Sequence, residues 1–96
     1  MSKLHPANTN RETVLLVRYG ITLETYRALE QSQNHCCKIC GKHKTDNRYG
    51  ILDVDHDHKT GEIRGLLCNN CNRGLGSFKD SQTNLLKAIQ YLKRKL

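Results

Sequence analysis

Apolar residues recur at helical spacing in two stretches near the N-terminus. From Asn10 the pattern is helical as far as Tyr19, and Gly20 suits the left-handed position just past a helix end. Thr22 can then cap a second helix with its hydroxyl group. One face of this second helix carries Leu23, Tyr26 and Leu29. Residues 1–9 have no such pattern, so we expect them to form a flexible tail.

The middle of the chain changes from helical spacing to short strands. An apolar run from Ile51 leads up to Val54, residues 59–62 have the composition of a turn, and Ile63–Leu67 runs back. This order predicts a β-hairpin within residues 50–67.

Two further helices are predicted after the hairpin. A short one covers residues 69–76, and a longer one follows Asp80 or Ser81, either of which can cap it. The longer helix has an apolar stripe that we expect to be buried, formed by Leu85, Ile89, Leu92 and Leu96. Together these elements predict a small α+β fold in a single domain that spans residues 1–96.

The cysteines form two pairs at metal-binding spacing. Cys37 and Cys40 make one Cys-x-x-Cys pair, and the predicted hairpin separates it from a second pair, Cys68 and Cys71. Four thiolates at this spacing are typical of a closed, tetrahedral, structural zinc site. A redox dithiol would not explain the second pair. Cys36 is left over as a free thiol, because its spacing to Cys40 is one residue longer than such knuckles prefer.

Size and charge narrow the classes of function. A domain of 96 residues buries little apolar surface, so we expect it to need a staple. Residues 1–11 are polar and lack the apolar region of a secretory signal, which favours zinc in a reducing compartment over disulfides. The longest apolar run, Val14–Val17, is too short to span a membrane. A net charge of +7 and a pI near 9.4 favour a polyanionic partner.

Three residues between and beside the cysteine pairs have the chemistry of a hydrolytic site. Asp55 is a hard oxygen ligand suited to Mg²⁺ or Mn²⁺, and Asn72, directly after the last cysteine, offers an amide oxygen as a second ligand. The imidazole of His56 can take a proton from water. Adjacent residues of a strand point to opposite faces, so Asp55 and His56 need a local kink to serve one site. A turn that begins at Asp57 can supply that kink.

Each of these residues also has a purely structural explanation. Asp57 and Thr60 can serve only to shape a turn, His58 can be an exposed loop residue, and Asn72 can cap the short helix. Their position between the cysteine pairs and at the Cys71–Asn72 dipeptide favours the chemical interpretation, phosphodiester hydrolysis.

At these residues the chain resembles the recombination endonuclease VII family, phage-type DNA endonucleases within the broader HNH or His-Me finger group. The resemblance covers about four fifths of the chain and is most specific between Val54 and Gly76. The matching runs are Tyr19–Tyr26, Cys37–Gly41, Leu52–His58, Thr60–Gly61 and Arg64–Gly76.

The resemblance implies a ββα-metal core, stapled by the zinc site and flanked by N- and C-terminal helices. It implies that Asp55 and Asn72 bind one catalytic Mg²⁺ or Mn²⁺ ion. His56 would be the general base, and His58 would assist at the scissile phosphate. The products would carry 5′-phosphate and 3′-hydroxyl ends. Arg64–Gly65 stands where the general HNH pattern has its middle Asn, so the group that orients His56 stays open, and a backbone carbonyl is one candidate.

The resemblance also sets expectations about partners and location. DNA is the expected partner, contacted by the basic residues Lys59, Arg64 and Arg73. A homodimer would supply two catalytic sites, one for each DNA strand. The apolar helices at both ends of the chain are consistent with a dimer. We expect a phage-encoded or prophage-derived protein that works in the cytoplasm of the bacterial host.

Two other functions fit parts of the pattern. A zinc-stapled module that binds nucleic acid without cleaving it would explain the cysteines and the basic charge. Such a module has no need for Asp55, His56 and Asn72 together. A protein-interaction finger of RING type is less favoured, because the series of ligands is too short for two zinc ions.

Overall fold

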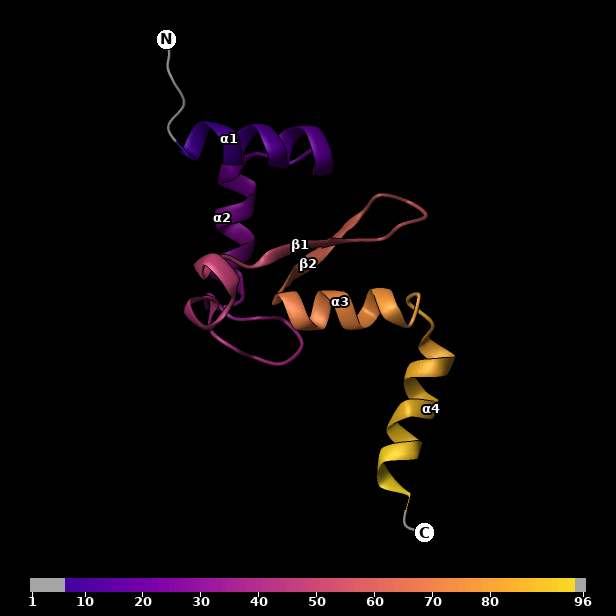
Figure 1. Ribbon diagram of the computed structural model, residues 1–96. Coiled ribbons are helices and arrows are strands. Elements are labelled where there is room, and N and C mark those ends of the chain that lie inside the picture. Colours follow the sequence, from indigo (N-terminus) through magenta and orange to yellow (C-terminus); the bar gives the residue numbers. More distant parts are fainter. Residues whose placement is uncertain (1–6, 95–96) are drawn as a thin grey trace.

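The chain forms an elongated arrangement of short elements around a two-stranded sheet (Figure 1). This computed structural model describes residues 7–94. The helices and strands are α1 (Ala7–Val14), η1 (Leu15–Tyr19), α2 (Leu23–Ser32), η2 (Lys44–Asp46), η3 (Arg48–Gly50), β1 (Asp53–His56), β2 (Ile63–Leu67), α3 (Asn69–Ser77) and α4 (Gln82–Lys93).

The N-terminal helix starts earlier than the sequence pattern indicates. Helix α1 begins at Ala7 rather than at Asn10. Of the expected tail, residues 1–6 lie outside the described residues. In the part of the chain from residue 7 to residue 94, no helix is long and apolar enough to cross a membrane.

The signals that end one helix and start the next are confirmed. Helix α1 continues into the π-helical turn η1, which ends at Gly20 in the left-handed conformation, with a φ of 69°. The Thr22 hydroxyl then accepts the N–H of Thr25 at 3.1 Å, which caps α2 as the sequence predicts. The end of the first helix and the start of α2 are therefore determined by local residues.

Strands β1 and β2 form the predicted antiparallel hairpin, but their pairing is irregular. Asp55 lies opposite Gly65, whereas the next residue, His56, lies opposite Ile63. Arg64 is therefore an extra residue on β2, which is the definition of a β-bulge. A bulge bends the pair of strands and changes the direction of the side chains beside it.

The buried apolar side chains gather where α2, the hairpin and the cysteine knuckles meet. They are Leu15, Tyr26, Cys37, Leu52, Val54, Leu66, Leu67 and Cys68. Fully burying one Leu or Val side chain contributes roughly 1.5–3 kcal/mol. The hydroxyl of Tyr26 also donates to the carbonyl of Leu52 at 2.6 Å, so α2 is joined to the segment that enters β1.

The outer edge of β2 is covered by the side chain of Gln33. Its Oε1 accepts the N–H of Leu66 at 3.0 Å, and its Nε2 donates to the carbonyls of Leu66 and Cys36, both at 2.9 Å. The amide group thus stands where another strand would pair. The neighbouring Gly65 has a φ of 155°, and a Cβ there would lie 2.9 Å from Lys38 Cδ, so glycine suits this position.

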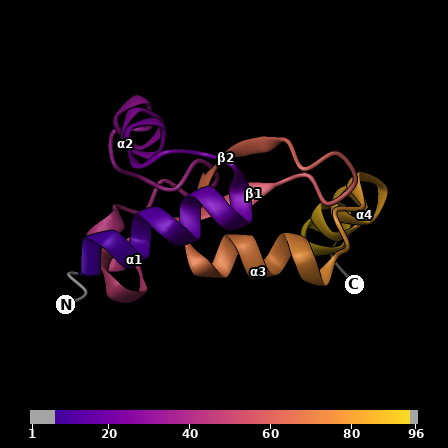
Figure 2. The ribbon, with the colours of Figure 1, turned by 90° about the horizontal axis from the view of Figure 1, so that it is seen from above.

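Helix α3 follows β2 directly and runs along the hairpin (Figure 2). Cys68, the residue between them, is the N-cap, and its sulfur accepts the N–H of Cys71 at 3.4 Å. The side chain of Asn47 adds a second link, because its Oδ1 accepts the N–H of Asn69 at 2.9 Å and its Nδ2 donates to the carbonyl of Ile51. The predicted short helix is confirmed.

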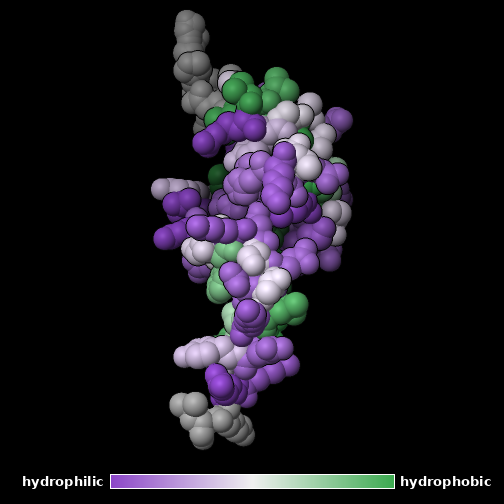
Figure 3. All heavy atoms as spheres, turned by 90° about the vertical axis from the view of Figure 1, so that its right-hand side faces the viewer, coloured by the Kyte–Doolittle hydropathy of each residue, from purple (hydrophilic) through white to green (hydrophobic). Residues whose placement is uncertain are grey.

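Helix α4 departs from the prediction of a buried apolar stripe. Ile89 is 48% exposed and Leu92 is 81% exposed, and none of the side chains of α4 described here is buried. Leu96 lies outside the described residues. The sequence pattern marks an apolar face but not a partner to cover it, and the turn at Lys79 and Asp80, both with positive φ, directs α4 away from the sheet (Figure 1). Apolar side chains are accordingly visible on the surface at that end of the molecule (Figure 3).

Candidate functional site

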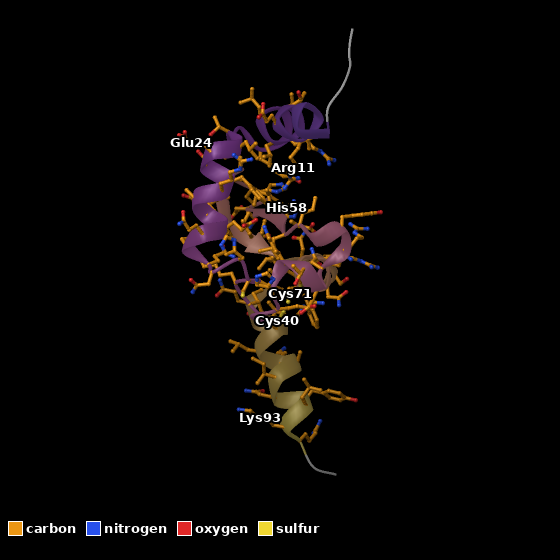
Figure 4. The ribbon with its side chains drawn as sticks, turned by 90° about the vertical axis from the view of Figure 1, so that its left-hand side faces the viewer. Arg11, Glu24, Cys40, His58, Cys71 and Lys93 are labelled. Carbon is orange, nitrogen blue, oxygen red and sulfur yellow. The ribbon has the colours of Figure 1, made fainter. Side chains whose placement is uncertain are left out.

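The four predicted zinc ligands lie together in space. The sulfur atoms of Cys37, Cys40, Cys68 and Cys71 all lie within 4.8 Å of one another. The Cys40 and Cys68 sulfurs are 3.7 Å apart. A tetrahedral ion with bonds of about 2.3 Å to sulfur places its ligands roughly 3.8 Å apart, so the cluster has the dimensions of a zinc site. Cys40 and Cys71 are labelled side by side in Figure 4.

Backbone N–H groups stabilise a negatively charged thiolate in this cluster. Burial raises the pKa of the Cys37 thiol, but backbone N–H groups, including that of Ile39 at 3.4 Å, outweigh burial and lower the pKa to about 6. Burial and its sulfur neighbours instead raise the pKa of Cys71 to about 12. A metal ion that binds here must therefore displace a proton from Cys71.

The first knuckle is closed by its own backbone, with Cys36 outside the cluster. The N–H of Cys37 donates to the carbonyl of Lys42 at 2.8 Å, and the N–H of Gly41 donates back to Cys37 at 3.0 Å. Cys36 is not among the four clustered sulfurs, and its thiol donates to the carbonyl of Asn34 at 3.1 Å.

A buried carboxylate anchors this knuckle to helix α2. Glu30 accepts hydrogen bonds from His35 Nδ1 and, at 3.2 Å, from Lys44 Nζ. Burial raises the pKa of Glu30, but these two partners outweigh it and hold the pKa below its ordinary value. No local pattern in the sequence indicates this network, because the three residues are brought together only by the fold of the knuckle.

Asp55 lies at the bulge and is paired with a cation. It is buried, at 7% exposure. Arg64 Nε donates to Asp55 Oδ2 at 2.9 Å, and Arg64 Nη2 donates to Asp55 Oδ1 at 3.0 Å. The same Nη2 donates to Asp80 Oδ2 at 3.3 Å. We call this chain of contacts, Asp55–Arg64–Asp80, the Arg64 bridge.

The two histidines proposed for catalysis lie next to each other. The rings of His56 and His58 are 4.8 Å apart between centroids, and the ring of Tyr19 lies 5.6 Å from that of His56. The turn expected at Asp57 is present, since its carboxylate accepts the N–H of Lys59 at 2.7 Å. Backbone N–H groups of the turn lower the pKa of Asp57. The bulge at Arg64, which the sequence did not reveal, adds a second irregularity on the opposite strand.

A cleft of about 480 Å³ opens between the hairpin loop and the α3–α4 turn. It is lined by Asp57, His58, Lys59, Arg64, Gly76, Lys79, Asp80 and Gln82. Two of the residues predicted to contact DNA, Lys59 and Arg64, are in this lining, and Arg73 is exposed on α3 outside it. Lys79 is a further cation in this lining, and nothing in its local sequence indicates it, because only the fold brings it into the same cleft as Lys59.

Asn72 lies on the first turns of α3. It is half buried, three residues before Leu75, which packs against the core. Residues three apart share a helix face, so Asn72 lies on the side of α3 that carries the core contact. Its neighbour Cys71 is a member of the sulfur cluster, so the position of Asn72 along the helix is fixed by that cluster.

Comparison with known proteins places this chain in a family. Residues 12–94 match the recombination endonuclease VII family. The Gene 59 protein of Mycobacterium phage D29 is 44% identical over 89 residues, which cover 92% of this chain and 53% of that protein. The Gene 59 protein of Mycobacterium phage L5 is 41% identical over 87 residues, covering 90% and 52%. The chain spans about half the length of these curated relatives. No solved structure matches it.

The matched region contains the cysteine cluster, the hairpin with its bulge, and helices α2 to α4. These are the same parts on which the resemblance in the sequence depended. The chain belongs to the recombination endonuclease VII family.

Proposed function

We propose that this chain is a metal-dependent DNA endonuclease of the HNH type, which hydrolyses phosphodiester bonds to 5′-phosphate and 3′-hydroxyl ends. The family supports a nuclease that acts on DNA. The basic charge of +7 supports a polyanionic substrate.

The observation that carries the proposal is the irregular pairing between Asp55 and His56. In a regular strand these neighbours would point to opposite faces. The bulge at Arg64 falls at this step of the ladder, which is where a change of side-chain direction is needed for both residues to serve one site. Bulges are common beside active sites for this reason.

His56 is the general base in this proposal. Its ring removes one proton from the attacking water, the new phosphorus–oxygen bond forms, and the bond to the 3′ oxygen breaks. The departing 3′ oxygen takes up a proton from solvent water and becomes the 3′-hydroxyl. His58, with its ring 4.8 Å away and its side chain in the lining of the cleft, assists at the scissile phosphate. The contact with Tyr19 gives the His56 ring a fixed neighbour and is our candidate for one of the groups that orient it.

Asp55 and Asn72 are the proposed ligands of the catalytic ion. A carboxylate and an amide oxygen are the donors that Mg²⁺ and Mn²⁺ accept, and such ions keep several waters and need few protein ligands. The donor set therefore fits a hard divalent cation. When bound, such an ion would offset the negative charge that develops on the phosphate oxygens in the transition state.

The cysteine cluster has a structural role in this proposal. Cys68 and Cys71 would hold zinc together with Cys37 and Cys40, and the bound ion would fix the start of α3, and with it Asn72, relative to the end of β2. We further propose that the protein acts on DNA as a homodimer, with one site for each strand, in the cytoplasm of the bacterial host. The phage relatives support a phage origin.

A cleavage assay tests the proposal. Zinc-loaded protein is incubated with labelled linear duplex, nicked plasmid and four-way junction DNA, with and without Mg²⁺ or Mn²⁺. We expect cutting that requires the added ion, and a loss of about 10²–10⁴-fold in rate for His56→Ala. His43→Ala is the matched control, because this exposed histidine lies on the first knuckle and outside the cleft. Intact DNA binding without cutting would move the function to a binding module, and the relative rates would show whether the enzyme nicks or selects DNA structures.

A further inference from the structure

The Arg64 bridge places a cation on the carboxylate that is proposed to bind the catalytic ion. Both oxygens of Asp55 accept hydrogen bonds from one guanidinium, at 2.9 and 3.0 Å. Such a two-point contact between arginine and a carboxylate is the strongest geometry for this pair. Asp55 is buried, so its charge is poorly screened by water. Any divalent cation at Asp55 therefore meets a carboxylate whose charge is already balanced.

Arg64 and a divalent ion compete for the same carboxylate. A carboxylate oxygen that donates electron density to a cation accepts a weaker hydrogen bond from a second cation, and the two positive charges repel each other. With Arg64 in place, binding of the ion is opposed. The competition is relieved only if the guanidinium finds another anion.

The surroundings of Arg64 supply a route to another anion. Its side chain is 34% exposed and lines the cleft, so it is not locked in the core. Lys59 and Lys79 line the same cleft, which makes it attractive to a DNA phosphate. Asp80, which also lines the cleft, accepts a hydrogen bond from Nη2 at 3.3 Å, so the guanidinium has a second anion on the cleft side. Arginine binds a phosphate with the same two-point geometry that it uses for a carboxylate.

We propose that Arg64 is a positioning residue that couples the binding of DNA to the binding of the divalent ion. Without DNA it holds Asp55 and lowers the affinity for the ion, and a phosphate in the cleft draws the guanidinium away and frees the carboxylate. The inference rests on the proposed role of Asp55 as an ion ligand. Because coupling between two ligands is reciprocal, the ion must also tighten DNA binding by the same factor.

Two binding measurements test this inference without any cleavage. All proteins are zinc-loaded and carry His56→Ala, so that the DNA stays intact. The affinity for Mn²⁺ without DNA is measured from the electron paramagnetic resonance signal of free Mn²⁺. The affinity for a fluorescein-labelled duplex is measured by anisotropy, with and without Mn²⁺.

The protein with Arg64 intact should bind the duplex about tenfold more tightly when Mn²⁺ is present, within the usual range of such couplings. Arg64→Gln should bind Mn²⁺ about tenfold more tightly without DNA, and its DNA affinity should depend less on Mn²⁺ than that of the protein with Arg64 intact. Arg64→Lys keeps a positive charge but cannot contact both oxygens of Asp55 in the two-point geometry. Its Mn²⁺ affinity should therefore lie between that of the protein with Arg64 intact and that of Arg64→Gln. It also serves as the second variant if Arg64→Gln fails to fold.

Lys59→Gln is the matched control, because Lys59 lines the same cleft but makes no contact with Asp55 among the described contacts. It should weaken DNA binding and leave the Mn²⁺ affinity without DNA unchanged. An unchanged or weaker Mn²⁺ affinity in both Arg64→Gln and Arg64→Lys would overturn the inference.

Asp55→Asn separates this inference from the proposed function. If Asp55→Asn weakens Mn²⁺ binding but the Arg64 variants do not strengthen it, only the coupling by Arg64 is wrong. If Asp55→Asn leaves Mn²⁺ binding unchanged, Asp55 is not an ion ligand, and the proposed site itself is wrong.

Discussion

Helices α3 and α4 follow each other in the chain but are held in different ways. Helix α3 contains Gly74 and Gly76, each of which costs about 1 kcal/mol relative to Ala in a helix. Helix α4 is richer in good helix formers, yet none of its described side chains packs against the buried core, whereas Cys71 and Leu75 of α3 do. The helix with the poorer intrinsic propensity is therefore the one that is fixed to the rest of the protein.

Polar and metal-binding contacts account for this difference. The N-terminus of α3 is tied by the Cys68 cap, by Asn47 and by the sulfur cluster, and Leu75 packs on the core. Helix α4 has its own cap, Ser81, and stands clear of the sheet. A helix next to a metal site can thus be imposed by its surroundings, whereas an isolated helix depends on its own sequence.

Loss of zinc should have the largest effect on the stability of α3. Cys71→Ser removes one of the four sulfurs, and we expect the protein to lose zinc and the sheet and α3 to unfold, because in such small sites the free energy of metal binding is folding free energy. Two-dimensional NMR should show collapsed amide dispersion for residues 21–77. A mutant that stays folded without zinc would count against the four-thiolate site.

Removing the hydrogen bonds that Asn47 makes to the start of α3 should reduce stability by a smaller amount. Asn47→Ala leaves the N–H of Asn69 and the carbonyl of Ile51 without their partner, and we expect a loss of about 2–3 kcal/mol in the free energy of unfolding. Urea denaturation followed by circular dichroism measures it. Asn84→Ala, an exposed asparagine in the first turn of α4, is the matched control and should change stability by less than about 0.5 kcal/mol. Equal effects in the two variants would mean that α3 is not specially tied.

The pH should change the affinity of the cysteine cluster for zinc, and through it the stability of α3, but not helix α4. Because the pKa of Cys71 is raised to about 12, this thiol is protonated at neutral pH and must release its proton when zinc binds. The affinity for zinc should therefore rise by at least about tenfold for each unit of pH between 6.5 and 7.5, because Cys71 alone releases one proton, and competition with a chelator at several pH values can measure this slope. Cys37, with a pKa of about 6, adds little in this range because it is mostly thiolate already. A flat profile would contradict the assignment of a protonated Cys71.

The smallest effect is expected on the exposed face of α4. Leu92 is 81% exposed, so Leu92→Ala should change the free energy of unfolding by less than about 0.5 kcal/mol. The fully buried Leu66 provides the contrast, since Leu66→Ala should cost about 2–5 kcal/mol. A large loss for Leu92→Ala, growing with protein concentration, would show that α4 is covered in an assembly.

The sequence predicted those features that depend on neighbouring residues. The caps at Thr22 and Ser81, the turn at Gly20 and the hairpin between the cysteine pairs were all visible as local patterns. The clustering of four sulfurs also followed from spacing, because two short knuckles leave few ways to bind one ion.

Contacts between distant parts of the chain were not predictable in this way. The Arg64 bridge joins residues of β1, β2 and the α3–α4 turn, and the side chain of Gln33 covers a strand edge that lies far along the sequence. Periodicity likewise gave the apolar face of α4 but not its exposure, since a pattern of residues contains no information about what packs against it.

The short path from Gly65, opposite Asp55, to Asn72 has an evolutionary consequence. It runs through two strand residues, the Cys68 cap and one helical turn, with no loop in between. The hairpin loop at residues 57–62 lies outside this path. Insertions or substitutions at residues 59–62 can therefore change the shape of the loop without changing the spacing of the proposed ion ligands.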